Sequence, residues 1–195
     1  MIDIVTNNYV DSSCPFAITK FSNLIIKYLE ENLEDSQEII ILCIGTDRST
    51  GDSLGPLVGY KLKPHINSYK GVHLMGTLDE PVHAKNLNEK IREINTYYNK
   101  ALVIAIDASL GSMDRIGYIN VRKGPLKPGL GVNKNLPKIG HISITGVVNF
   151  KGIMEYMILQ NTRLSLVMHM ADIIAKSLNR ALFKLFNSNY KKELT

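Results

Sequence analysis

The 195-residue sequence contains no tryptophan and only two cysteines, Cys14 and Cys43. Cys43 lies within an apolar run, where a small buried thiol is expected, and neither cysteine has a partner at zinc-site spacing. A disulfide framework and a structural zinc site therefore have little support. No apolar stretch approaches the ~20 residues needed to span a bilayer, and the N-terminus lacks the basic and apolar regions of a signal peptide. We expect a cytoplasmic protein with no membrane partner.

The sequence also lacks a concentrated run of one charge. Its 23 Lys and Arg residues against 18 Asp and Glu give a formal net charge of +5, but the bases are spread out. The exceptions are a loose cluster at 122–138 and the pair Lys191 and Lys192. A solvated basic surface is a simpler interpretation than a phosphate-binding stripe, so we expect no nucleic-acid partner.

Short apolar runs alternate with segments of helical periodicity along most of the chain. Strands are predicted at 39–44, 72–75, 101–106, 118–121 (an edge strand) and 139–145. Helices are predicted from Phe21 to Leu33, from Leu54 to Lys63 (stopped by Pro64), from Leu87 to Tyr98, from about Asn149, and from Leu164 to Leu185.

This alternation predicts an α/β fold, a three-layer α/β/α sandwich with a mostly parallel sheet. The hydrophobic content of 45% suits a globular core, and the length suits one domain. We expect that domain at 19–187, between an irregular arm at 1–18 and a tail at 188–195.

Sites in parallel sheets form beyond the carboxyl ends of the strands, which draws attention to the loops at 45–55, 76–84 and 107–113. The first loop superficially resembles a nucleotide-binding phosphate loop. However, five residues separate its glycines instead of four, and Asp52 stands where the motif requires lysine. A carboxylate there would repel a phosphate, which excludes a nucleotide site.

The same loop contains Gly51-Asp52-Ser53-Leu54-Gly55, which matches G-x-S-x-G and the GDSL signature of a serine esterase family. Asp107 and His141 follow in the Ser, Asp, His order of an α/β-hydrolase. Yet Ser53 lies well beyond its strand, and the C-terminal region lacks the late Asp-x-x-His pair of GDSL esterases. Ser53 is more simply a residue at a helix N-terminus. A GDSL-like serine esterase stays an alternative.

Two carboxylates give a third interpretation of the same region. Asp52 opens a helix, where the helix dipole favours a negative charge, and Asp107 ends the predicted strand at 101–106. From spacing alone, a helix cap and a solvated strand end are the better-supported roles. Brought together by neighbouring strand ends, however, the two carboxylates would face one cleft.

Three more titratable residues, Asp79, Glu80 and His83, follow the second predicted strand at the same rim. They could add a base or a metal ligand to the carboxylates. Exposed loop residues are the simpler interpretation, and Glu80 is the best functional candidate among the three.

A family resemblance favours the carboxylates. It is carried by three segments: IGTDRSTGDSLGP at 44–56, AIDASLGSMDRIGYINV at 105–121 and GPLKPGLGVNKNLPKIG at 124–140. In this order they resemble the YyaC-type spore proteases and sporulation proteins, over roughly Ile39 to Leu182. More distantly, they are similar to the germination protease of spore-forming bacteria and to the hydrogenase-maturation endopeptidases, whose fold is α/β/α.

The resemblance implies an endopeptidase of sporulation, in the cytoplasm of the sporulating cell or forespore, with Asp52 and Asp107 as its catalytic residues. In the hydrogenase-maturation group these places carry a glutamate and an aspartate that contact nickel, with a histidine as third ligand. This chain has aspartate at the first place and no clear histidine match. We therefore expect no cofactor; if nickel or zinc binds, Asp52 and Asp107 would be joined by Glu80 or His141.

Two carboxylates ~4 Å apart repel by about 4 kcal/mol at an effective dielectric of ~20, or about three pK units. One of the pair then stays protonated and polarises the scissile carbonyl, while the other activates water. Residues expected to contact a protein or peptide substrate are Asp47, Arg48, Glu80, and, in the loop at 123–138, Gly129 and Gly131. The alternative from another class is a catalytically silent binding protein that uses the same cleft. A homo-oligomer is compatible with either.

Overall fold

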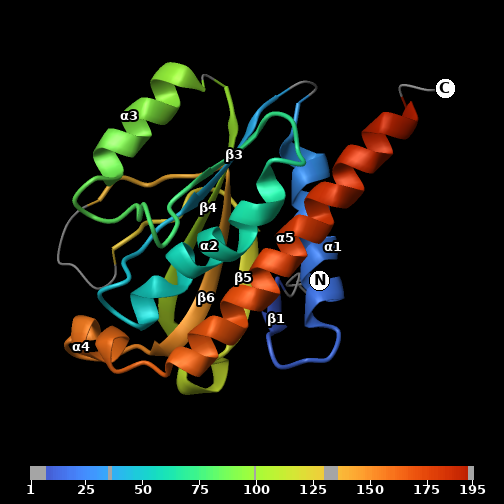
Figure 1. The fold of residues 1–195 in the computed structure, drawn as a ribbon. Helices are drawn as coiled ribbons and strands as arrows, with labels where there is room; N and C mark the ends of the chain where they lie inside the picture. Colours follow the sequence, from blue (N-terminus) through green and yellow to red (C-terminus); the bar gives the residue numbers. More distant parts are fainter. Residues whose placement is uncertain (1–7, 35–36, 99, 130–135, 193–195) are drawn as a thin grey trace, which may run out of the picture.

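The protein folds around one six-stranded sheet with the strand order β1-β5-β6-β4-β2-β3 (Figure 1). The computed structural model describes residues 8–34, 37–98, 100–129 and 136–192, with side chains up to Asn187. The strands are β1 (Tyr9–Asp11), β2 (Ile39–Cys43), β3 (Val72–Met75), β4 (Leu102–Gly111), β5 (Tyr118–Lys123) and β6 (Ile142–Phe150). The helices are α1 (Ala17–Asn32), α2 (Leu54–Ile66), α3 (Leu87–Tyr97), α4 (Glu155–Gln160) and α5 (Leu164–Lys192), with 3₁₀ turns η1 (Gly51–Ser53) and η2 (Met113–Arg115).

Strands β3, β2, β4 and β6 are parallel to one another, whereas β5 is antiparallel to β6 and β1 is antiparallel to β5. All five residues of β2 are buried, because helices cover both faces of the sheet at this strand. That burial explains the continuous apolar run at 39–43, since a strand with two covered faces has no solvent side to make polar.

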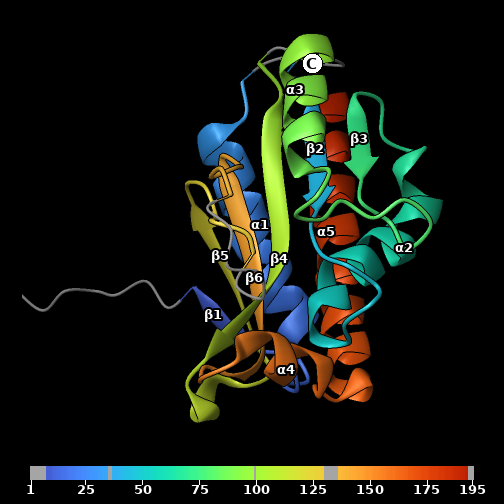
Figure 2. The ribbon, with the colours of Figure 1, turned by 90° about the vertical axis from the view of Figure 1, so that its left-hand side faces the viewer.

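Helices α1, α2 and α5 lie on one face of the sheet and α3 on the other (Figures 1 and 2). The two faces of β2 belong to separate core clusters. Ile39 and Ile41 pack with the three-helix layer, while Ile40 and Leu42 pack with Leu87 and other residues of the α3 side. The predicted three-layer α/β/α sandwich with a mostly parallel sheet is therefore confirmed.

The two ends of the domain differ from the prediction. Tyr9–Asp11 form β1, paired with β5, and α1 begins at Ala17, so much of the expected arm at 1–18 is ordered structure. A three-residue strand is too short for its periodicity to be read. Because β1 pairs with the outer side of β5, β5 is an inner strand and not the edge strand that the sequence predicts. Helix α5 extends to Lys192, into the expected tail, because no glycine or proline ends it after Leu185.

Three internal boundaries also differ. Pro64 lies inside α2 and does not stop it; the helix ends two residues later, and Tyr60, whose carbonyl loses its partner, is on the solvent side. Strand β4 continues past Asp107 to Gly111. Strand β6 runs to Phe150, so the next helix begins at Glu155 and not near Asn149.

The connections place a crevice between β2 and β4. From β2 the chain passes through α2 to β3 on one side, then through α3 to β4 on the other side. From β4 the chain goes on to β5 and β6, which lie on the opposite side from β3. The chain therefore leaves the adjacent ends of β2 and β4 in opposite directions, which makes a topological switch point, where open parallel sheets bind their ligands.

Candidate functional site

The loop after β2 folds back tightly and sets Asp52 at the switch point. Gly45 has a φ of 143°, and a Cβ at this position would lie 2.0 Å from the backbone oxygen of Asp52. A Cβ at Gly55 would likewise lie 2.1 Å from the backbone oxygen of Ile44. Only glycine permits these approaches, so the two glycines bring η1 and the start of α2 against the end of β2.

Asp107 reaches the same point from β4. Its neighbour Ile106 is paired with Cys43, the last residue of β2, so Asp107 lies just beyond the end of β2. Side chains alternate along a strand, which places Asp107 on the α3 side with Val103 and Ala105. Asp107 is inside β4, but the neighbouring strand β2 has already ended, so the Asp107 side chain lies beside the crevice.

A cavity of about 340 Å³ holds both aspartates. Its lining comes from the loop after β2, the segment before α3, the loop after β5, and α4. The lining includes Arg48, Asp52, His83, Lys85, Asp107, Gly129 and Tyr156. Two acidic side chains 55 positions apart in the sequence thus share one cavity.

Asp107 is 6% exposed. Burial, and secondly the negative charge of Asp52, raise the pKa of Asp107 well above its ordinary value. Two backbone hydrogen bonds lower this pKa: one from the N–H of Ala108, 2.8 Å from Oδ1, and one from Gly129. The environment therefore favours the neutral, protonated form of Asp107.

Burial also raises the pKa of Asp52, but a hydrogen bond from the backbone of Thr46 and the charge of His83 work against that rise. Asp107 is the more deeply buried of the two carboxyl groups. Of the two carboxyl groups, Asp107 therefore favours the protonated form more strongly, and Asp52 is the better carboxylate.

The serine triad suggested by the sequence is not formed. Ser53 is buried, and its Oγ donates a hydrogen bond to the backbone oxygen of Thr50 at 2.6 Å. The His141 Nδ1 accepts from the backbone N–H of Val103 at 2.9 Å. Val103 lies four residues before Asp107, or about 13 Å along a strand. His141 is therefore at the other end of the sheet and is neither a triad base nor a ligand beside Asp52 and Asp107.

The predicted substrate-binding residues divide into two groups. Arg48 and Gly129 line the cavity with the aspartates, whereas Asp47 is exposed outside its lining. Gly131 lies outside the described residues. Glu80 is exposed and lines a separate hollow that follows β3 between α2 and α3.

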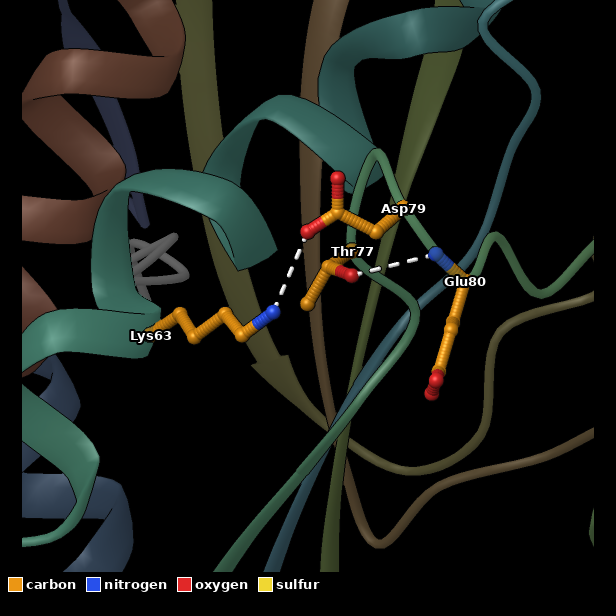
Figure 3. Close-up of polar contacts among 4 residues, drawn as sticks. All are labelled: Lys63, Thr77, Asp79 and Glu80. Carbon is orange, nitrogen blue, oxygen red and sulfur yellow. Dashed lines mark hydrogen bonds and ion pairs between the residues drawn. The ribbon is translucent and has the colours of Figure 1, made fainter.

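Glu80 is directed there by a turn after β3. Its backbone N–H donates to Thr77 Oγ1 at 3.2 Å, and neighbouring Asp79 pairs with Lys63 Nζ at 3.1 Å. In Figure 3 the Glu80 side chain points away from this pair. The carboxylate preferred from the sequence is thus not brought to Asp52 and Asp107.

His83 takes that place; the sequence analysis named it as a possible base or ligand but preferred Glu80. After the turn, Val82 forms a parallel bridge with Ile44, and its backbone oxygen accepts from the Gly45 N–H at 2.8 Å. This bridge returns the chain to the sheet edge and sets the next residue, His83, in the cavity. The buried apolar Val82 was the signal that could have pointed to it.

The residues do not fit a three-ligand nickel or zinc site. Within the part of the chain that the structure describes, no three His, Cys, Asp or Glu side chains come together in a way that could hold a metal ion. No described helix combines the length and apolar character needed to cross a membrane.

Comparison with known proteins agrees with this architecture. A family model described as "Protein of unknown function (DUF1256)" matches residues 9–177. The chain is 52% identical over 141 residues to the uncharacterized protein YyaC of Bacillus subtilis (strain 168), covering 72% of this chain and 68% of YyaC. Among solved structures it is similar to the [NiFe] hydrogenase maturation protease HycI from Thermococcus kodakarensis KOD1. That likeness has a TM-score of 0.51 and 19% identity, and covers 79% of this chain and 97% of HycI. The expected resemblances to YyaC-type proteins and to the hydrogenase-maturation fold are confirmed.

Proposed function

The chain belongs to the DUF1256 family, and we propose that it is a peptidase that hydrolyses peptide bonds of a protein substrate with Asp52 and Asp107. The observation that carries this proposal is the pair itself: two carboxyl groups in one cavity, the charge of one raising the pKa of the other. The HycI-like fold is compatible with peptidase chemistry. As the resemblance to YyaC-type proteins led us to expect, we place the activity in the cytoplasm of sporulating cells.

The two carboxyl groups have different roles. Asp107 carries the shared proton and donates a hydrogen bond to the scissile carbonyl oxygen, which makes the carbonyl carbon more electrophilic. Asp52, ionised and held by the backbone N–H of Thr46, accepts a proton from the attacking water. Both roles follow from the difference in burial between the two side chains.

A protein substrate is supported by the surface next to the cavity. Large apolar side chains are exposed at the end of β6, in the segment that follows it and on α4: Phe150, Ile153, Met154, Tyr156 and Met157. We call this set the α4 surface. Ile153 is 93% exposed, and Tyr156 belongs both to the α4 surface and to the cavity lining. An extended apolar segment could bind on the α4 surface with its chain leading into the cavity.

Purified protein incubated with extracts of spore proteins should release fragments visible by mass spectrometry. Asp52→Asn and Asp107→Asn should each lower the cleavage rate on the order of 10²-fold or more, because each removes a proton-transfer or polarising group. Asp47→Asn is the matched control, since this exposed aspartate is in the same loop but outside the cavity.

Cleavage that persists in both cavity variants would remove the pair from the mechanism. A stable complex with a spore protein and no fragments would instead favour the catalytically silent binding protein on the same fold.

A further inference from the structure

His83 lines the aspartate cavity, and its ring has an unused polar atom. Nδ1 is buried, yet no described residue forms a hydrogen bond with it. Three other histidine rings do have protein partners: His73 with Glu38 at 3.0 Å, His141 with Val103 at 2.9 Å and His169 with Ser12 at 2.9 Å. Because buried polar atoms are nearly always hydrogen-bonded, this unpaired nitrogen sets His83 apart from those three rings, and His83 lines the cavity that holds Asp52 and Asp107.

The backbone around His83 is held from both sides. Its N–H donates to Asn86 Oδ1 at 2.8 Å, and its carbonyl accepts from the N–H of Leu87 at 2.9 Å, at the start of α3. On the other side, Val82 is bridged to Ile44 at the end of β2. The ring is therefore carried by a fixed segment between the sheet and α3, as a side chain with a chemical role should be.

His83 also lies close enough to Asp52 for its charge to favour the ionised form of that carboxyl group. The cavity thus combines a carboxylate, a protonated carboxyl group and an imidazole. An imidazole can give or take a proton near neutral pH, which the two carboxyl groups cannot both do while they share one proton.

We propose that His83 is a third catalytic residue, which protonates the departing amine of the cleaved peptide; this inference rests on the proposed function. Asp52 takes a proton from water as the water oxygen bonds to the carbonyl carbon, and Asp107 donates a hydrogen bond to the carbonyl oxygen. The C–N bond then breaks as the protonated imidazole gives its proton to the amine nitrogen. The proton on Asp52 passes to His83, which restores the site. One water is consumed, and one carboxylic acid and one amine are formed.

The test compares two leaving groups. For a peptide substrate, His83→Gln should lower kcat on the order of 10²-fold or more, because an amine leaves only after protonation. For the matching p-nitrophenyl ester, whose leaving group departs without a proton, kcat should change by less than about threefold. Imidazole added to His83→Ala should restore part of the peptide activity. His65→Gln, a change at an exposed histidine outside the cavity, is the control.

Equal losses on the ester and the peptide, with no rescue by imidazole, would show a structural role and overturn the inference. Unchanged peptide cleavage by His83→Gln would overturn it as well, while leaving the aspartate mechanism in place. Absence of peptide cleavage by the unmodified protein would overturn the proposed function, and the role of His83 with it. Urea unfolding of each variant shows whether a loss of activity comes from a loss of folded protein.

Discussion

Asp107→Asn is expected to make the protein inactive and, at neutral pH, more stable. The amide oxygen of asparagine can still accept the hydrogen bond that the backbone N–H of Ala108 donates to Oδ1. The shape of the side chain is retained, whereas the buried negative charge and its repulsion with Asp52 are removed. Stability and activity should therefore change in opposite directions.

The size and sign of the effect follow from proton binding. The ordinary pKa of the Asp107 carboxyl group is 3.8, and the folded protein raises it well above this value. Between these two pH values the unfolded chain loses the proton while the folded protein keeps it. The free energy of unfolding therefore falls as pH rises, by up to about 1.4 kcal/mol per pH unit. Above the folded-state pKa the loss is complete and stays constant.

Urea unfolding from about pH 4 to about pH 8 measures this directly. The difference in unfolding free energy, Asp107→Asn minus wild type, should start near zero and rise to a plateau. In an Asp52→Asn background the plateau should be lower, because the repulsion from Asp52 is already absent. A difference that is flat with pH, or that falls as pH rises, would refute the assignment of Asp107 as the protonated member of the pair.

Three further predictions concern the loop, the esterase alternative and the α4 surface. Gly45→Ala should destabilise the fold by about 1–3 kcal/mol in thermal unfolding and impair cleavage. The control is Gly124→Ala: Gly124 also has a positive φ, but a Cβ there would have nothing within 4 Å. Its loss of stability therefore measures backbone strain without the clash. Ser53→Ala should cost about 0.5–1.5 kcal/mol by removing the bond to the Thr50 carbonyl, and retain cleavage; lost activity with retained stability would revive the esterase. Ile153→Asp should raise KM about tenfold for a protein substrate and not for a short peptide; equal effects on both would show that the α4 surface does not bind substrate.

General rules made a meeting of Asp52 and Asp107 possible, whereas spacing alone favoured simpler roles for both residues and the family resemblance decided for the pair. Apolar runs locate parallel strands, parallel strands place their carboxyl ends on one rim, and both aspartates follow such runs. What the rules missed was the local detail. Asp107 is inside β4, not at its end, and it borders the cavity because the neighbouring strand β2 is shorter.

The choice of Glu80 over His83 shows where sequence reasoning stopped. Both residues follow β3 within a few positions, and an acidic residue was the natural companion to two acids. Which of them faces the cavity depends on the turn at Thr77 and on the single bridge of Val82 to Ile44. One bridge between distant residues leaves no periodic pattern in the sequence. The same limit applies to β1, because its three residues form a strand only by pairing with β5, which the local sequence does not reveal.

The hydrogen bond from Gly129 to Asp107 links a loop position to an acid–base equilibrium. Because this contact favours the ionised carboxylate, moving Gly129 away must increase the fraction of Asp107 that carries a proton, and ionisation must in turn hold Gly129 in place. A ligand that displaced this glycine without replacing its hydrogen bond would therefore increase proton occupancy at Asp107. When the ligand leaves and the glycine returns, the balance is reversed, so occupancy of the cavity and the charge state of its deepest group change together.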